Sequence, residues 1–301
     1  MEVKEYSYEE YPEFNEEING AKYISTTGDE KGVYYRKDIV YETKDGLDRH
    51  LEILEPFTRN KPDKKYPVLV YVQGSAWRKQ DVYKSIPLLT SLARKGFCIA
   101  IVEYRESTIA TFPAQAMDAR NAIRYMSLHA SEYSGDASKM FVGGSSSGGH
   151  TALLAMLLED SEEVPEELKE GIIDIKGILD YYGAIDMTFE DSFPDTLNHH
   201  LPDSPEGMEM GCNMREHPEV AVKGSVKTYI TNEKDIPPVM IMHGTKDRSV
   251  NPKQSAVLYQ KLKECGKEAE LYFLKGADHG GCEFFSKEAV DIATLFMKKH
   301  M

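Results

Sequence analysis

Short runs of consecutive apolar residues recur along the chain and alternate with segments in which apolar residues return every three or four positions. The short runs are typical of strands buried on both faces of a sheet, and the periodic segments are typical of amphipathic helices. Strands are predicted at residues 33–41, 50–54, 68–72, 97–102, 140–142, 175–182, 239–242 and 270–274, and helices at 84–95, from 113 onward, at 151–158, and near 252–265 and 283–299. This alternation predicts an α/β fold with a mostly parallel eight-stranded sheet and helices on both faces.

The beginning of this pattern and one interruption of it define the expected organisation. The first two strands alternate apolar and polar residues around a Lys-Asp-Gly turn at 44–46, which predicts an antiparallel hairpin. Residues 1–30 are rich in Glu and Tyr without a clear period, and we interpret them as an N-terminal arm ahead of one domain at 31–301. Residues 184–235 interrupt the alternation between the sixth and seventh strands, and we interpret them as a small cap insertion.

Composition and charge exclude several classes of partner. The 301 residues carry a formal net charge of -14, from 50 acidic and 36 basic side chains. Nucleic acids and anionic membrane surfaces attract positive patches, so we expect neither as a partner. We also expect no signal peptide at the acidic N-terminus and no transmembrane run. The four cysteines are far apart, which favours reduced thiols in a cytoplasmic protein over a disulfide framework or a zinc site.

The stretch at residues 139–150 reads KMFVGGSSSGGH and stands between a predicted strand and a predicted helix. Strand, sharp turn and helix are the context of a nucleophile elbow, and Gly144 to Gly148 fit G-x-S-x-G with Ser146 at the centre. Glycines on both sides let strand and helix approach closely, and the N–H of Ser147 would face a developing oxyanion. A P-loop is excluded because no Gly-Lys-Ser/Thr closes the turn. On this motif alone, an ordinary Gly/Ser-rich loop is equally compatible.

A nucleophilic serine needs a base, and the base needs an acid that orients it. His279 follows the last predicted strand in a glycine-rich loop, and Asp247 follows the seventh, so both lie at the carboxyl edge of the sheet where sites of open α/β folds form. The order Ser146, Asp247, His279 is the order of α/β-hydrolases. Asp278 and Asp235 rank below Asp247 as the acid. We expect His243 to cap the loop after its strand rather than to take part in the chemistry.

Together with the loop at residues 73–77, QGSAW, the chain from about residue 68 to its end resembles the α/β-hydrolase superfamily, in its hormone-sensitive-lipase-like and acetyl-esterase-like branch. The chain departs from the His-Gly-Gly loop of that branch at Gln73 and Ser75. The resemblance implies that the N–H groups of Ser75, Ala76 and Ser147 form the oxyanion hole. It also implies an α/β-hydrolase catalytic domain at 31–301.

Further matches to this branch are Tyr104-Arg105, Phe112-Pro113, Asp118, Gly148-Gly149-His150 and Tyr182-Gly183. We interpret Arg105 and Asp118 as a structural ion pair that braces the elbow. Ser145 stands where many relatives carry Asp. Trp77, beside the oxyanion hole, is expected either to bind substrate or to anchor the core.

The resemblance implies a serine carboxylesterase that hydrolyses short-chain acyl esters of small molecules, including acetyl or feruloyl esters of carbohydrates, and that uses no metal or cofactor. Two alternatives stay open. One is a serine peptidase of the prolyl-oligopeptidase type, although too little chain precedes residue 33 for a propeller; the other is a binding protein that kept the fold. The sequence leaves open whether the chain forms a homo-oligomer.

Overall fold

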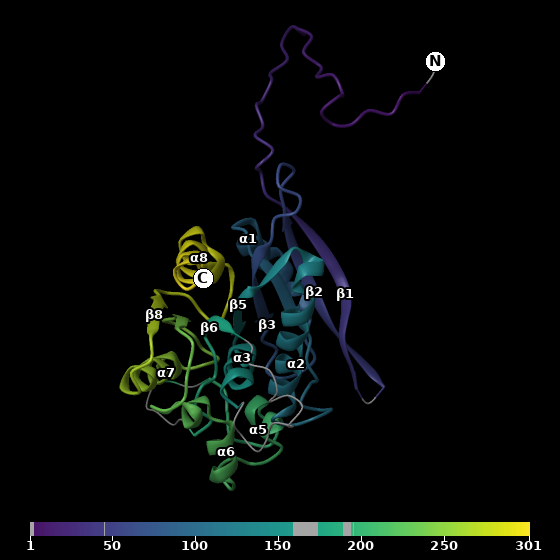
Figure 1. Cartoon of the computed structure of the whole chain (residues 1–301). Helices are drawn as coiled ribbons and strands as arrows, with labels where there is room; N and C mark the ends of the chain where they lie inside the picture. Colours follow the sequence, from purple (N-terminus) through teal and green to yellow (C-terminus); the bar gives the residue numbers. More distant parts are fainter. Residues whose placement is uncertain (1–2, 45, 159–173, 189–193, 195) are drawn as a thin grey trace.

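The computed structural model describes residues 3–44, 46–158, 174–188, 194 and 196–301, and within them eight strands form one sheet (Figure 1). The strands are β1 (Gly32–Lys44), β2 (Leu47–Phe57), β3 (Tyr66–Val72), β4 (Cys98–Val102), β5 (Gly135–Ser145), β6 (Ile175–Tyr181), β7 (Val239–Gly244) and β8 (Ala269–Leu274). Their order across the sheet is β1-β2-β4-β3-β5-β6-β7-β8. β2 pairs antiparallel with β1 and β4, and every later pair is parallel.

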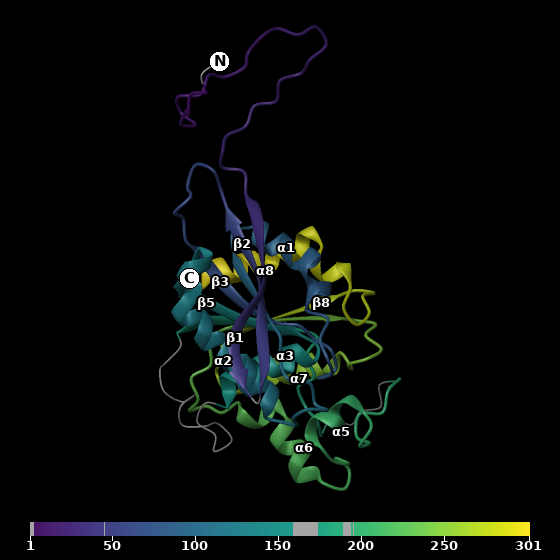
Figure 2. The same cartoon turned by 90° about the vertical axis from the view of Figure 1, so that its right-hand side faces the viewer.

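Helices cover both faces of this sheet (Figure 2). The α-helices are α1 (Ile86–Arg94), α2 (Ala114–His129), α3 (Ser147–Leu157), α5 (Pro205–Met210), α6 (Pro218–Gly224), α7 (Lys253–Glu264) and α8 (Lys287–Lys299), and the 3-10 helices are η1 (Val82–Ser85), η2 (Ala130–Tyr133), η3 (Val226–Tyr229) and η4 (Cys282–Phe285). One buried apolar cluster joins α1 and α8 to the sheet, and two others join α2, α3 and α7 to its opposite face. The sheet is therefore the middle of three layers, and β5 lies near its centre.

The structure confirms the predicted fold, the eight strands, and the position of the elbow after the fifth of them. Boundaries differ where tertiary pairing overrides local signals. The fifth strand was predicted at 140–142 but begins earlier, because Gly135 and Asp136 also pair with β3. The last helix begins at Lys287 rather than near residue 283, because η4 occupies residues 282–285 first. The centre of the predicted hairpin turn, residue 45, lies outside the described residues.

The described part of the N-terminal arm runs away from the domain in both views (Figures 1 and 2). Thr27 and Gly28 bind the base of the arm to Asn60 through hydrogen bonds of 2.6 and 3.1 Å. The predicted cap contains α5, α6 and η3, although residues 189–193 and 195 lie outside the described residues. Among the described residues, no helix combines the length and the apolar character needed to cross a bilayer. All four cysteines are free thiols.

Candidate active site

Ser146 lies in a sharp turn between β5 and α3, at the carboxyl end of the central strand. Its φ of 55° and ψ of -128° fall in a backbone region that residues other than glycine rarely adopt. The surrounding glycines make this turn feasible, since a Cβ on Gly144 would collide with the Gly148 backbone and a Cβ on Gly148 would collide with the Val72 backbone. The N–H of Ser146 donates to the Tyr181 carbonyl at 2.8 Å, which fixes the turn against β6.

The structure brings Ser146, His279 and Asp247 into one hydrogen-bonded chain. Nε2 of His279 lies 2.8 Å from the Ser146 Oγ, and its Nδ1 lies 2.7 Å from Oδ2 of Asp247. The three residues come from the ends of β5, β7 and β8, and Gly280, with φ 78°, follows the histidine in its loop. The ring of Tyr182 contacts the His279 imidazole edge to face, with 4.8 Å between ring centroids. In this arrangement the imidazole is placed to accept the Ser146 proton.

The Asp247 carboxylate is buried and accepts three hydrogen bonds, with a fourth nitrogen in close contact. The N–H groups of Ser249 and Val250 each donate to Oδ1 at 2.8 Å, and two histidines, His279 and His243, approach Oδ2 at 2.7 and 3.1 Å. Burial alone would raise the pKa of Asp247, but the hydrogen bonds from His243 and His279, the His279 charge and the Val250 N–H hold this pKa below its usual range. Asp247 is therefore ionised at neutral pH.

The loop after β3 lies beside Ser146 and is held by a directed chain of hydroxyl groups. The Ser75 hydroxyl donates to the Arg78 carbonyl at 2.5 Å, so its oxygen accepts the proton of Tyr104 Oη at 2.9 Å. Tyr104 Oη in turn accepts from Ser147 Oγ at 3.3 Å, and Ser147 Oγ accepts the Ser75 N–H at 2.9 Å. This chain holds the loop where Ala76, with φ 57°, adopts a left-handed conformation.

The three predicted oxyanion donors therefore differ in their present partners. The Ser75 N–H is occupied by the Ser147 hydroxyl. The hydrogen bonds among the described residues include none from the N–H of Ala76 or of Ser147. Both residues line the cavity next to Ser146, where an oxyanion would form. The assignment of these groups to an oxyanion hole stays a prediction.

A cavity of about 390 Å³ opens beside Ser146 and His279. Ser146 and His279 form part of its wall, Tyr71 and Phe285 add aromatic surface, and His199 and Glu206 of the cap segment line it too. The Nδ1 atom of His199 lies 2.8 Å from Oε1 of Glu206. The cavity is large enough for a small organic ester.

Trp77 also lines this cavity, but it is 2% exposed and packs mainly into the protein. Its apolar neighbours are Ala184, Met187, Met210, Met214 and Ala221. Its ring contacts His150 edge to face at 5.1 Å. This position agrees with the interpretation of Trp77 as a core anchor, and its role in substrate binding stays a prediction.

The acidic residues that ranked below Asp247 lie elsewhere. Asp278 accepts hydrogen bonds from Arg248 on the surface, with 2.7 Å between Arg248 Nε and Asp278 Oδ2, and Asp235 is exposed before β7. The expectation for His243 was incomplete, because its Nε2 does bond to the loop, at the Val250 carbonyl, but also approaches Asp247. The only signal in the sequence was the spacing of four residues between His243 and Asp247.

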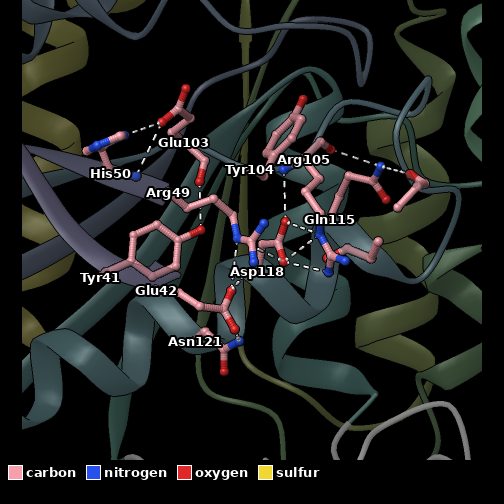
Figure 3. Close-up of polar contacts among 12 residues, drawn as sticks. Tyr41, Glu42, Arg49, His50, Glu103, Tyr104, Arg105, Gln115, Asp118 and Asn121 are labelled. Atoms are coloured by element: carbon pink, nitrogen blue, oxygen red, sulfur yellow. Dashed lines mark hydrogen bonds and ion pairs between the residues drawn. The ribbon is translucent and has the colours of Figure 1, made fainter. Parts of the chain in front are cut away.

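The predicted Arg105–Asp118 pair is present and belongs to a larger network (Figure 3). Arg105 Nη2 lies 2.7 Å from Oδ1 of Asp118, and its N–H donates to Oδ2 at 2.8 Å. Arg49 of β2 approaches the same carboxylate at 3.6 Å and also pairs with Glu42 at 2.8 Å. The network ties the first hairpin to α2 and to the loop after β4; bracing of the elbow stays an interpretation.

Comparison with known protein families matches residues 52–262, more than two thirds of the chain, to the family described as BD-FAE. The chain belongs to the BD-FAE family. Similar proteins include the esterase LipC of Mycobacterium tuberculosis, 27% identical over 82% of this chain and 60% of LipC. The isoprenylcysteine alpha-carbonyl methylesterase ICME of Arabidopsis thaliana is 25% identical over 81% of this chain and 56% of ICME. This BD-FAE chain thus spans less than two thirds of the length of these two curated relatives.

Solved structures with the same architecture are also esterases by title. A truncated form of a carbohydrate esterase from gut microbiota superposes with a TM-score of 0.74 at 23% identity, over 91% of this chain and 98% of that one. An esterase from Thermogutta terrifontis, with butyrate bound, superposes with a TM-score of 0.69 at 22% identity, over 89% of this chain and 94% of that one. These likenesses confirm the predicted α/β-hydrolase fold for this BD-FAE protein, and the family agrees with the predicted resemblance to serine esterases.

Proposed function

We propose that this protein is a serine carboxylesterase that hydrolyses short-chain acyl esters. The observation that carries the proposal is the continuous hydrogen-bonded chain from Ser146 Oγ through His279 to the buried Asp247, at 2.8 and 2.7 Å. The curated names of its relatives, among them "Esterase LipC" and "Probable carboxylic ester hydrolase LipM" of Mycobacterium tuberculosis, support the same reaction class.

In the proposed reaction Ser146 Oγ attacks the ester carbonyl carbon while its proton passes to Nε2 of His279. Asp247 keeps the proton of the imidazole on Nδ1 and stabilises the imidazolium that forms. The N–H groups of Ala76 and Ser147 bind the oxyanion, and the Ser75 N–H joins them if it leaves the Ser147 hydroxyl. His279 then protonates the departing alcohol. Water, deprotonated by His279, hydrolyses the acyl-enzyme and releases the acid.

For the substrate we propose acetyl or feruloyl esters of carbohydrates. The titles of two similar structures support this choice: one is a carbohydrate esterase, and the other is a bifunctional GH43-CE protein of Bacteroides eggerthii, 26% identical with a TM-score of 0.72 over 91% of this chain and 38% of that one. The modest cavity of about 390 Å³ favours a short acyl chain over a long one. We also propose that the cap at 184–235 supplies the wall that contacts the alcohol part, since His199 and Glu206 line the cavity.

Hydrolysis of p-nitrophenyl acetate, butyrate and octanoate by the wild type and by Ser146→Ala tests the reaction. We expect turnover to fall with chain length and to drop by at least about 1000-fold in Ser146→Ala, because the nucleophile is lost. Ser138→Ala is the matched control, since Ser138 lies at the exposed far end of the same strand. A fluorophosphonate probe should label the wild type and Ser138→Ala but not Ser146→Ala.

Two results would contradict the proposal. Unchanged turnover in Ser146→Ala would remove Ser146 from the reaction, and labelling without turnover of any ester would point to a peptidase. Once acetate turnover is established, acetylated and feruloylated sugars test the substrate. A kcat/KM for both that is no higher than that for p-nitrophenyl acetate would contradict the carbohydrate assignment.

A further inference from the structure

His243 is a second histidine on the carboxylate of Asp247, and it comes from β7 rather than from the β8 loop. It is completely buried. Its Nε2 lies 3.1 Å from Oδ2 of Asp247 and 3.0 Å from the Val250 carbonyl oxygen, and its Nδ1 lies 2.6 Å from the Ser255 hydroxyl. His243 does not line the cavity, so it can influence a bound substrate only indirectly, through Asp247 and His279.

These neighbours fix the position of the ring proton. A carbonyl oxygen and an ionised carboxylate only accept, so Nε2 of His243 carries a proton, which it donates to the Val250 carbonyl while lying 3.1 Å from Oδ2 of Asp247. Nδ1 forms its hydrogen bond with the Ser255 hydroxyl, at 2.6 Å. Both nitrogens of the buried ring therefore have a polar partner.

Asp247 needs this donor most when His279 is neutral. Before the reaction His279 must be neutral to accept the Ser146 proton, and the buried carboxylate then lacks the charge of the His279 imidazolium. A buried charge without compensating hydrogen bonds is costly. Two backbone N–H groups hold Oδ1, but at Oδ2 the only other donor besides His279, among the described residues, is His243.

We propose that His243 is a positioning residue whose Nε2–H faces Oδ2 of Asp247 and keeps this carboxylate ionised and aimed at His279. This inference rests on the proposed function, since it assigns His243 a task in the same site. It also makes a claim about the Asp247–His279 pair that can be measured without any substrate.

The sign of the expected effect follows from charge. A donor at Oδ2 stabilises the unprotonated pair, which carries one negative charge, more than the pair that has taken up a proton. Loss of the donor therefore moves proton uptake by the pair to higher pH, whichever of the two residues holds the proton. The loss of one hydrogen bond to a charged group should shift the pH midpoint of proton uptake by about one pH unit.

Other ionisable groups around the pair stay the same in this comparison. Tyr182 from the end of β6 faces both histidines, and burial raises its pKa to about 12. Asp278 and Arg248 form their ion pair on the solvent side. None of these groups contacts the ring of His243 through a hydrogen bond, so substitutions at His243 leave their hydrogen bonds in place.

Three variants separate the proposed role from packing. In His243→Asn the amide can replace the contact of Nδ1 with Ser255 but is too short to donate to Asp247. In His243→Gln the amide nitrogen reaches the place of Nε2 and restores the donor. Ser255→Ala removes the partner of Nδ1 and leaves Nε2 and its proton in place. Asn and Gln both keep a polar amide at this buried position. The two variants can therefore be compared even if an apolar replacement of His243 would prevent folding.

The experiment is a pH titration of the His279 ring by NMR on histidine-labelled protein, with the pH dependence of kcat/KM for p-nitrophenyl acetate beside it. We expect the midpoint of the His279 titration to rise by about one pH unit in His243→Asn. In His243→Gln and Ser255→Ala the midpoint should stay within about 0.3 pH units of the wild-type value. The acid limb of the rate profile should follow, with kcat reduced and KM unchanged. An equal midpoint in folded His243→Asn and wild type, or an equal shift in Asn and Gln, overturns the proposal.

Failure of the proposed function gives a different result. If the wild type hydrolyses no ester, the rate profile is lost, but the NMR midpoints of wild type, Asn and Gln still decide whether His243 acts on the pair. Conversely, ester turnover that depends on Ser146, with identical midpoints in all folded variants, would retain the function and reject the role of His243.

Discussion

Asp247 and Asp118 are two aspartates with fully buried side chains that the fold uses in opposite ways. Asp118 on α2 is held by two guanidinium groups, with Arg105 Nη2 at 2.7 Å and Arg49 Nε at 3.6 Å, and lies inside the network of Figure 3. Asp247 is approached by two imidazoles and two backbone N–H groups, and one of those imidazoles reaches the cavity.

The difference lies in the chemistry of the partners. A guanidinium stays protonated at any pH a protein tolerates, so Asp118 and its arginines form a fixed set of charges that joins secondary-structure elements. An imidazole gains and loses a proton near neutral pH, so the same carboxylate beside His279 can follow a proton transfer. Burial of an acid thus indicates structure or catalysis only once its partners are known.

The largest expected effect is that of Asp247→Asn on turnover. The amide keeps the size of the side chain but removes the charge that orients and stabilises the His279 imidazolium, so kcat for p-nitrophenyl acetate should fall by about four orders of magnitude. Thermal unfolding monitored by circular dichroism should show a folded protein. Turnover within tenfold of the wild type would place the catalytic acid elsewhere, and would contradict the different roles given to Asp247 and Asp118.

Asp118→Asn should affect stability before it affects chemistry. The substitution leaves Arg49 and Arg105 without their shared buried carboxylate, and breaking such a pair costs about 3–5 kcal/mol of the free energy of unfolding. Urea denaturation measures this loss. Asp136→Asn is the matched control, because its partly exposed pair with Lys139 is worth no more than about 1 kcal/mol.

The activity of Asp118→Asn sharpens the result. At a temperature well below the midpoint of its thermal unfolding, the variant should retain kcat within about tenfold of the wild type, since Asp118 does not line the cavity. A loss as deep as that of Asp247→Asn in a folded protein would show that the network of Figure 3 controls the elbow and is not only structural.

Asp180 on β6 is a third buried aspartate, and it packs against the backbone of Gly149 and Gly183 rather than against a cation. Burial raises its pKa to about 7, opposed only by the Gly183 backbone. Because the folded state holds this proton more tightly than the unfolded state, its contribution to stability is complete below pH 4 and is lost as pH rises through 7. Relative to Asp180→Asn, the wild type should lose roughly 3 kcal/mol between pH 5 and 8.

Unfolding of both proteins in urea at pH 5 and pH 8 tests this expectation. The stability of Asp180→Asn should decline less over this range than that of the wild type. A parallel decline would mean that Asp180 is already ionised in the fold at pH 5, and that a buried carboxylate here needs no cation at all.

The sequence predicted those parts of the two regions that depend on local pattern and chain order. The positions of Ser146, Asp247 and His279 follow from three strand ends, because parallel strands end at one edge of the sheet. The Arg105–Asp118 pair came from a family resemblance and is present. Neither inference required knowing which strands are neighbours.

What the sequence could not predict depends on the register between distant segments. Arg49 reaches Asp118 because β2 pairs antiparallel with β4, which no local pattern records. The Ser75 N–H meets the Ser147 hydroxyl only once β3 and β5 are aligned side by side. His243 was assigned to the loop alone because the conformation of the turn that brings it to Asp247 is absent from the spacing of residues.

The smallest expected effect is that of Asp278→Asn, next to His279. Asp278 is the chain neighbour of His279, yet its carboxylate points to Arg248 at the surface, and that arginine together with two backbone N–H groups lowers the pKa of Asp278 to about 2. Exposed charges act weakly on their neighbours because water and salt screen them. Asp278→Asn should therefore change kcat/KM less than about twofold at pH 8 in 0.15 M salt, in the assay in which Asp247→Asn loses four orders of magnitude. A drop above tenfold would mean that closeness along the chain, rather than burial and direct contact, selects the acid that serves His279.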